Sequence, residues 1–326
     1  MPNIVGAAST MIQVILKFDQ RVITNYIIPP HLILQPFVDN YVLSTSHGER
    51  IVLNSTWPAS NETSLVFYMA DQPFHYVNIK TPSPLRYDRG CIVGLQTGCN
   101  GTVNFNGVYH TFIIQFKANG FNKLFSLPAS EFVNKLYYMD EVFGSGAKEL
   151  NEKLRHAEEV LLMAQFADHF LLHFLTGQKK TAQLHDGITF VANELFTSST
   201  LYSVEVYACK ANMSVRNFGR RFIEQVGISP KFYCRLLRFN NAVNTKIKKP
   251  TSSWTSIAHE CGYYDQMHMI RDFKQFAGLN PKKLFASAEE LTHSSSAVNG
   301  SSGATFNEIS TDSVNEEFVI VRRTDF

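Results

Sequence analysis

Short apolar runs separated by turn residues dominate the chain between residues 18 and 140. The runs are rich in aromatic and β-branched side chains, as in 64–69, 91–95 and 109–116. Glycine, proline, asparagine and aspartate lie between them, for example at 71–73 and 104–107. Such runs at this spacing predict an all-β sandwich or barrel.

From about residue 147 the apolar residues recur at every third or fourth position, which is the spacing of amphipathic helices. One or two such helices are predicted from Leu150, Leu154, Leu161, Leu162, Phe166, Phe170, Leu171 and Phe174. A polar joint at 177–181 follows, and the pattern from 188 to 285 is helical throughout.

The end of the chain has a third kind of composition. Its serine- and glycine-rich part, 294–303, cannot bury enough apolar surface to offset the entropy of ordering it. We expect a disordered tail in which 318–322 forms either a short strand or a docking peptide. The prediction is an α+β protein of two domains, with a β-rich sensor or dimerisation domain at 1–146, connecting helices at 147–187, an all-α domain at 188–287 and an acidic tail at 288–326.

A helix, a tight turn and a second helix are predicted between residues 203 and 222. Ser203 is suited to cap the first helix, Asn212 tolerates the positive φ of a turn, and Ser214 is suited to cap the second helix. This order of elements is typical of a helix-turn-helix unit. On the second helix we expect an inward face of Phe218, Phe222 and Ile223 and an outward face of Arg216, Gly219 and Arg220.

The same plan recurs about 51 residues later, between residues 254 and 273. Gly262 stands at the place of Asn212, and Asp265 at the place of the capping Ser214. We expect Met269 and Phe273 to be buried, whereas Gln266, Met267, Ile270 and Arg271 point outward. Both units close with a helix-ending glycine followed by a proline, in 227–230 and 278–281.

Residues 231–248 are predicted to form one long helix between the two units. Such a rod would hold the two outward faces at a fixed distance, and successive major grooves on one face of DNA lie about 34 Å apart. Charge supports a polyanionic partner: 188–287 holds 14 Lys and Arg against 6 Asp and Glu, in a chain whose net charge is only +2.

The segment from about 188 to 286 resembles the AraC family of bacterial transcription regulators. The resemblance rests on two motif sets, Met213-Ser214-x-Arg216-x-Phe218-x-Arg220-x-Phe222 with Gly227-x-Ser229-Pro230, and Ile257-Ala258-x-x-x-Gly262-Tyr263-x-Asp265-Gln266 with Arg271-Asp272-Phe273-Lys274 and Gly278-x-x-Pro281. It implies base contacts from Arg216, Arg220, Gln266, Met267, Ile270 and Arg271, and phosphate contacts from Arg221 and Lys274.

Several residues of this segment also have structural interpretations. Asn212 replaces the usual turn glycine, and Gly219 stands where the family often has a longer side chain. Arg235 and Arg238 on the long helix are candidates either for DNA contacts or for structural ion pairs. For His268 we expect a packing or capping role rather than ligand binding.

The N-terminal part resembles the cupin-like domains attached to some of these regulators, through 62–67, 94–97 and 116–120. A metal-binding cupin needs clustered histidines, but His31, His47, His75 and His110 are isolated in the sequence, so we expect no metal and no cofactor. A small-molecule pocket inside the barrel and a domain used only for dimerisation both remain open. The five scattered cysteines favour reduced thiols, with redox sensing by Cys91 and Cys99 as the alternative.

Taken together, the sequence predicts a DNA-binding transcription regulator, an activator modulated through its N-terminal domain. The alternative is a cupin-like small-molecule-binding protein or enzyme with an accessory helical domain, but no catalytic pair or metal triad is evident, so we do not expect an enzyme. Expected partners are double-stranded DNA, RNA polymerase, a small-molecule effector and a second copy of the chain. With no apolar run long enough to span a membrane and no charged leader, the expected location is the cytoplasm.

Overall fold

The computed structural model describes residues 23–69, 74–77, 83–84, 89–177, 186–197, 203–285 and 318–320. Most of the tail and of the joint at 177–181 lies outside these residues. Cys91 and Cys99 of the redox-sensing alternative are both described as free cysteines, and Cys91 is buried. Of the tail only 318–320 is described, and these residues form a strand, as one of the two alternatives for 318–322 predicts. Among the described residues no helix is both long and apolar enough to cross a membrane.

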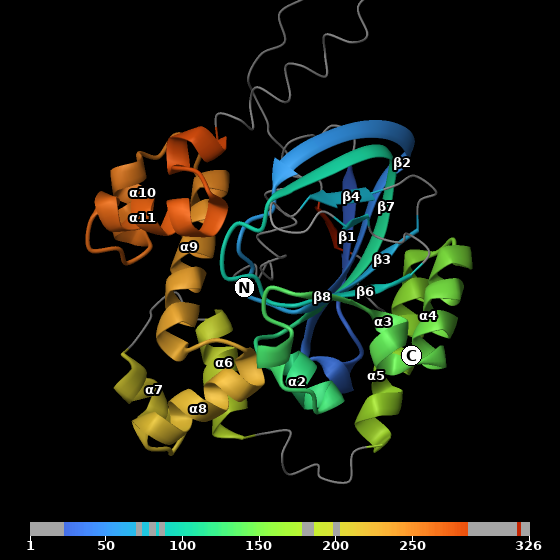
Figure 1. The fold of residues 1–326 in the computed structure, drawn as a ribbon, viewed down its shortest axis with the longest axis horizontal. Helices are drawn as coiled ribbons and strands as arrows, with labels where there is room; N and C mark the ends of the chain where they lie inside the picture. The colour runs from blue at the N-terminus through green and yellow to red at the C-terminus, as the bar shows by residue number, and fades with distance from the viewer. Residues whose placement is uncertain are drawn as a thin grey trace, which may run out of the picture.

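The N-terminal domain is one curved sheet, as the strand-rich pattern predicts (Figure 1). Its strands are β1 (Thr24–Ile28), β2 (Val38–Thr56), β3 (Ser64–Tyr68), β4 (Phe74–Val77), β5 (Ser83–Pro84), β6 (Cys91–Val93), β7 (Thr102–Phe116), β8 (Leu136–Tyr138) and β9 (Phe318–Ile320). They pair in the order β8-β6-β3-β7-β2-β1-β9, and β4 joins β7 beyond β3. The pairs are antiparallel except for β1 with β9, which is parallel.

The long strands β2 and β7 bend the sheet. Their register shifts between Thr45 and Arg50, where His47 has φ 51° and Gly48 has φ 85°. Residues 46–49 of β2 lie opposite the single residue Tyr109 of β7, and extra residues on one strand increase the local twist and bend the strand. The strands therefore continue past the bulge in a new direction, where β7 pairs with β4.

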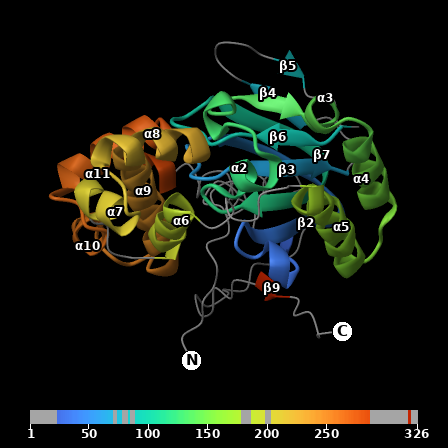
Figure 2. The same cartoon turned by 90° about the horizontal axis from the view of Figure 1, so that it is seen from below.

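Helices close one face of this sheet and enclose an aromatic core. They are α2 (Gly120–Phe125), η3 (Ala129–Glu131), α3 (Met139–Phe143), α4 (Ser145–His156) and α5 (Val160–Gly177), and a single turn, η2 (Leu32–Leu34), precedes β2. Phe67, Phe112 and Phe116 from the sheet are buried with Leu154 and Leu171 from α4 and α5. In Figure 2, α4 and α5 lie on the opposite side of the sheet from the helical domain.

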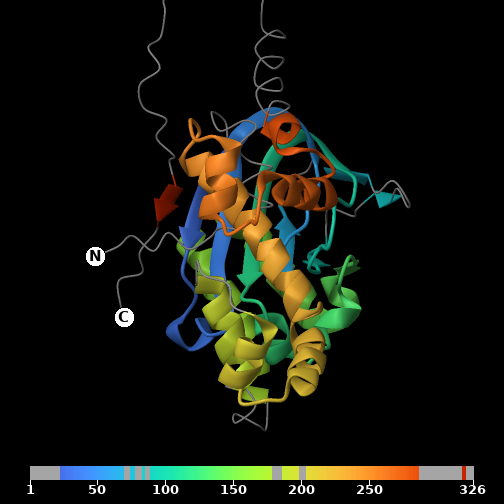
Figure 3. The same ribbon diagram turned by 90° about the vertical axis from the view of Figure 1, so that its left-hand side faces the viewer.

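The C-terminal domain is all helical, as predicted. Its helices are α6 (Gly187–Thr197), α7 (Val204–Lys210), α8 (Val215–Val226), α9 (Pro230–Lys248), α10 (Trp254–Glu260) and α11 (Gln266–Ala277). Figure 3 shows α9 running as a single rod between the yellow helices of one end and the orange helices of the other. The predicted long helix over 231–248 is thus confirmed.

Candidate nucleic-acid interface

The first helix-turn-helix unit consists of α7, a three-residue turn and α8. Asn212 adopts φ 54°, so this residue accepts the left-handed turn conformation as predicted. Ser214 accepts a hydrogen bond from the backbone N–H of Asn217 at 3.4 Å and caps α8. Phe218 and Phe222 are fully buried, and Gly227 ends the helix with φ 103°.

The second unit, α10 and α11, repeats these features. Gly262 takes the turn position with φ 73°, and Asp265 caps α11 by accepting from the backbone N–H of His268 at 2.7 Å. The ring of His268 lies 2.8 Å from the same carboxylate, a contact with the capping residue that supports the packing or capping role expected for this histidine. These hydrogen bonds, the backbone one first, hold the pKa of Asp265 below its usual range. Met269 and Phe273 are buried as predicted.

The arginines of α9 have structural partners. Arg235 donates to Asp272 at 2.6 Å and to Gln275 at 2.7 Å, which ties the rod to α11. Arg238 lies 5.0 Å from the ring centre of Tyr263 and donates to the carbonyl of Gly262 at 3.3 Å. Of the two interpretations of these arginines, the structural one is therefore supported.

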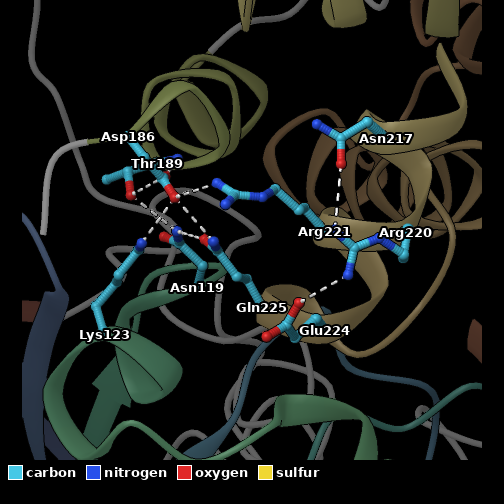
Figure 4. Close-up of polar contacts among 9 residues, drawn as sticks. All are labelled: Asn119, Lys123, Asp186, Thr189, Asn217, Arg220, Arg221, Glu224 and Gln225. Carbon is cyan, nitrogen blue, oxygen red and sulfur yellow. Dashed lines mark hydrogen bonds and ion pairs between the residues drawn. The ribbon is translucent and has the colours of Figure 1, made fainter. Parts of the chain in front are cut away.

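Most of the residues expected to read bases lie at the surface. Arg216, Arg220, Met267 and Arg271 are exposed, as is the expected phosphate ligand Lys274, whereas Gln266 and Ile270 are half-buried. Arg220 is 70% exposed and lies between Asn217, 3.3 Å away, and Glu224, 4.0 Å away (Figure 4).

One inward assignment on α8 is wrong. Ile223 is 41% exposed, although the spacing of apolar residues placed it in the core. The physical reason is that Phe222 already fills the inward position and each residue of an α-helix turns by about 100°. The next apolar residue that faces inward is Val226, which is buried.

Arg221 differs from Arg216 and Arg220 because its side chain is directed at a carboxylate of the helical domain that the N-terminal domain also contacts. Its Nη1 lies 3.9 Å from Oδ2 of Asp186, the residue before α6. The same carboxylate accepts hydrogen bonds from Gln225 of α8 at 2.8 Å and from Lys123 of α2 at 3.0 Å (Figure 4). Burial raises the pKa of Asp186, but hydrogen bonds from Gln225, the Thr189 amide and Lys123 outweigh it and hold the pKa below its usual range.

A buried asparagine completes this contact between the domains. Asn119 donates both to Oγ1 of Thr189 and to Oε1 of Gln225, each at 3.0 Å. We call Asn119, Lys123, Asp186, Thr189 and Gln225 the interdomain cluster. Sequence reasoning missed it, since nothing in the sequence shows that Asn119 meets a residue 106 positions away.

The second helix-turn-helix unit also contacts the N-terminal domain. The amide of Ala59 donates to the carbonyl of Phe276 at 2.7 Å, and Asn240 of α9 donates to Oδ1 of Asn61 at 2.7 Å. Both units are therefore fixed on the sheet domain through other faces than those that carry Arg216 and Arg271.

A cavity of about 670 Å³ lies between the end of α2 and helices α4 and α5. Phe125, Phe143 and Phe174 line it, and Lys153 and His169 stand among its lining residues. This place differs from the pocket expected inside a barrel. Among the described residues, no group of three or more histidines, cysteines, aspartates or glutamates is arranged to hold a metal ion.

Comparison with known proteins agrees with the geometry of the two units. Residues 207–287 match the family model of a helix-turn-helix domain, and residues 26–137 match that of a domain of unknown function, DUF6597. The chain carries a C-terminal helix-turn-helix domain and is a DNA-binding transcription regulator. Sequence comparison with the curated proteins finds no relative of the regulator.

One solved structure similar to the regulator is the DNA-binding domain of AdpA in complex with a target DNA. It is 25% identical in sequence, the match covers 32% of the regulator and 96% of that chain, and the TM-score is 0.30. ToxT from Vibrio cholerae O395 has 9% identity and covers 81% of the regulator and 96% of its own chain, with a TM-score of 0.39. ToxT from Vibrio cholerae strain SCE256 with a bound unsaturated fatty acid has 10% identity, covers 81% and 94%, and has a TM-score of 0.41.

Proposed function

We propose that the regulator reads one DNA duplex with α8 and α11 in successive major grooves. The observation that carries this proposal is the joining of two capped recognition helices by one continuous rod. At 1.5 Å per residue, the 19 residues of α9 span about 28 Å, close to the roughly 34 Å between successive grooves.

In this proposal the base contacts come from Arg216 and Arg220 on α8 and from Gln266, Met267, Ile270 and Arg271 on α11. An arginine can bond O6 and N7 of guanine at once, and a glutamine can do the same with N6 and N7 of adenine. Lys274 binds a phosphate, which positions the protein without reading sequence. Arg221 is the other candidate phosphate ligand, and it can bind a phosphate only when it is released from Asp186.

Selection of duplexes from a random pool by the full-length regulator tests this function. The expected product is a site with two sequence-specific segments about one helical turn apart. Affinity for it should fall steeply with salt, because each neutralised phosphate releases counterions. Flat salt dependence or a single short segment would contradict the proposal.

Replacing Arg271 distinguishes sequence-specific base contacts from the electrostatic attraction of the protein to any DNA phosphate. Arg271→Ala should weaken binding to the selected site by about 1–3 kcal/mol and relax one base position. Lys274→Ala, the matched control on the same helix, should weaken binding to all sequences alike and lower the salt slope by about one. If Arg271→Ala keeps the wild-type DNA footprint and the wild-type base preference, α11 does not lie in the major groove.

We also propose that the N-terminal domain modulates DNA binding, through an effector or through pairing with a second copy. The contacts of the interdomain cluster with α8 support such coupling. A change at Asn119 or Lys123 would alter the hydrogen bonds of Gln225 on α8, the helix that reads DNA in this proposal. Activation through RNA polymerase follows from the family resemblance. Transcription in vitro from a promoter carrying the selected site distinguishes activation from repression.

A further inference from the structure

Three residues of α8 form an apolar stripe with a gap in its middle. Val215, Gly219 and Ile223 are four residues apart, so they lie on one side of the helix. Val215 is 46% exposed and Ile223 is 41% exposed. Because Gly219 has no side chain, the stripe has a recess between two aliphatic side chains, and we call these three residues the α8 notch.

The fold itself gives no reason for a glycine at position 219. A methyl group placed there would meet no atom within 4 Å in the part of the chain that the structure describes. At Gly120 and Gly187 it would instead lie 1.8 Å and 2.3 Å from backbone carbonyl oxygens. Glycine inside a helix costs about 1 kcal/mol relative to alanine. The benefit of Gly219 therefore has to come from something that the chain binds.

Next to the notch stand the two arginines expected to read bases. Arg216 and Arg220 each follow a notch residue by one position, which places them about 100° further round the helix. Arg220 is oriented by Asn217 and Glu224 (Figure 4). On α11, Arg271 likewise has aliphatic neighbours, Met267 and Ile270, with Met267 58% exposed. Both recognition helices thus combine cationic and aliphatic side chains on the surface.

In the major groove, guanine offers acceptors to arginine, and thymine offers the one apolar group, its C5-methyl. We propose that the α8 notch receives the C5-methyl group of a thymine, with Val215 and Ile223 on either side of it. The inference rests on the proposed function and adds the base that this part of α8 recognises. Gly219 is the residue next to Arg220, about 1.5 Å away along the helix axis. The base pair of the guanine bound by Arg220 contains cytosine and no thymine, so the thymine lies in the base pair next to it.

Deoxyuridine is the matched probe, since it differs from thymidine only by that methyl group. In the duplex selected by the full-length regulator, each thymidine is replaced in turn by deoxyuridine. The Arg220→Ala variant identifies the neighbouring guanine by the base position that it relaxes. At one thymidine beside this guanine, the wild-type protein should lose affinity about fourfold, as expected for one buried methyl group.

Filling the recess should remove this discrimination. Gly219→Ala should bind the thymidine and deoxyuridine duplexes with a ratio close to one, and its urea midpoint should be equal to or above that of the wild type. Ile223→Ala should lower the ratio partly. The control is Val206→Ala, because Val206 is an aliphatic residue of the same unit that is 39% exposed, and its ratio should stay at the wild-type value.

Three results would overturn the inference. The wild type could bind its site specifically without any loss at a deoxyuridine beside that guanine, or Gly219→Ala could keep the wild-type ratio. Ile223→Ala could also lose transcription activation with unchanged DNA binding, which would assign the notch to a protein partner. In each case the DNA-reading function stands. Absence of sequence-specific binding by the wild type would instead remove the proposed function itself.

Discussion

Arginines that look alike in the sequence have different surroundings in the fold. Arg216 and Arg220 are exposed on α8, whereas Arg235 is held by Asp272 and Gln275. Arginine spacing alone cannot separate these cases, because the partner of Arg235 lies 37 residues away. The contacts of individual side chains are therefore the feature that the sequence predicts least well. Single substitutions are the most informative test of these contacts.

Asp39 of β2 provides a prediction at this scale. Burial raises the pKa of its carboxyl to about 6, although nearby Lys117 opposes the shift. Oδ2 of Asp39 is buried without a hydrogen-bond partner among the described residues. Since the folded pKa lies above the unfolded value of 3.8, this residue favours folding below pH 4 and loses that contribution as the pH rises from about 4 to 6.

Asp39→Asn should therefore stabilise the protein above pH 6, by about 1–3 kcal/mol at pH 7.5, and have little effect near pH 4. Urea unfolding at several pH values measures both. Glu49→Gln is the control, as an exposed carboxylate on the same strand whose loss should matter little at either pH. Equal effects of Asp39→Asn at pH 4 and 7.5 would contradict the assignment to titration.

At the scale of the element, α9 acts as a rod only if α11 is fixed to it. The Arg235–Asp272 ion pair provides this connection, and the Asp272 side chain is only 7% exposed. Removing one partner of a buried ion pair is costly because the other charge is left without compensation. The pair therefore links the stability of the second unit to its orientation.

Arg235→Met should lower the free energy of unfolding by about 2–4 kcal/mol, slightly less than for a fully buried pair because Arg235 is partly exposed. It should also weaken binding to the selected site more than binding to random DNA, since the spacing of the two helices is no longer fixed. Lys248→Met, an exposed cation at the end of the same helix, should leave stability nearly unchanged. Wild-type stability in Arg235→Met would show that the pair does not hold α11.

The sequence predicts a feature of an element well when that feature depends on residues close together in the chain, and poorly when it depends on residues far apart. Ser214, Asp265, Asn212 and Gly262 act on neighbours within a few residues, so the caps of α8 and α11 and the turns of both units could be recognised without a structure. The cap expected from Ser203 is wrong, because its side chain makes no capping hydrogen bond to α7. The bend of β2 at Gly48 and the position of the sheet against α8 depend on pairings across the chain, for which single residues carry no signal. Ile223 was misplaced because an apolar residue at helical spacing is more often buried than exposed.

At the scale of the whole molecule, the N-terminal domain contacts both helix-turn-helix units. Ala59 contacts the second unit at Phe276, Asn61 contacts α9 at Asn240, and the interdomain cluster contacts the first unit through Gln225. The base-reading residues stay outside these contacts, but Arg221 does not, because its guanidinium is directed at Asp186. The N-terminal domain can therefore influence the phosphate contacts of α8 without covering its reading face.

Asp186→Asn isolates this influence. Asparagine is as good a helix cap as aspartate, and its Oδ1 can still accept from the Thr189 amide. The amide nitrogen that replaces Oδ2 no longer accepts from Gln225 or Lys123 and no longer attracts Arg221 by charge. Arg221 then becomes available to a phosphate, and the slope of log affinity against log salt concentration should become steeper by about 0.9. Arg221→Ala in the Asp186→Asn background should restore the wild-type slope, whereas Arg221→Ala alone should change it little. An equal slope in Asp186→Asn and wild type, with the fold intact by circular dichroism, would mean that Asp186 does not compete with DNA for Arg221.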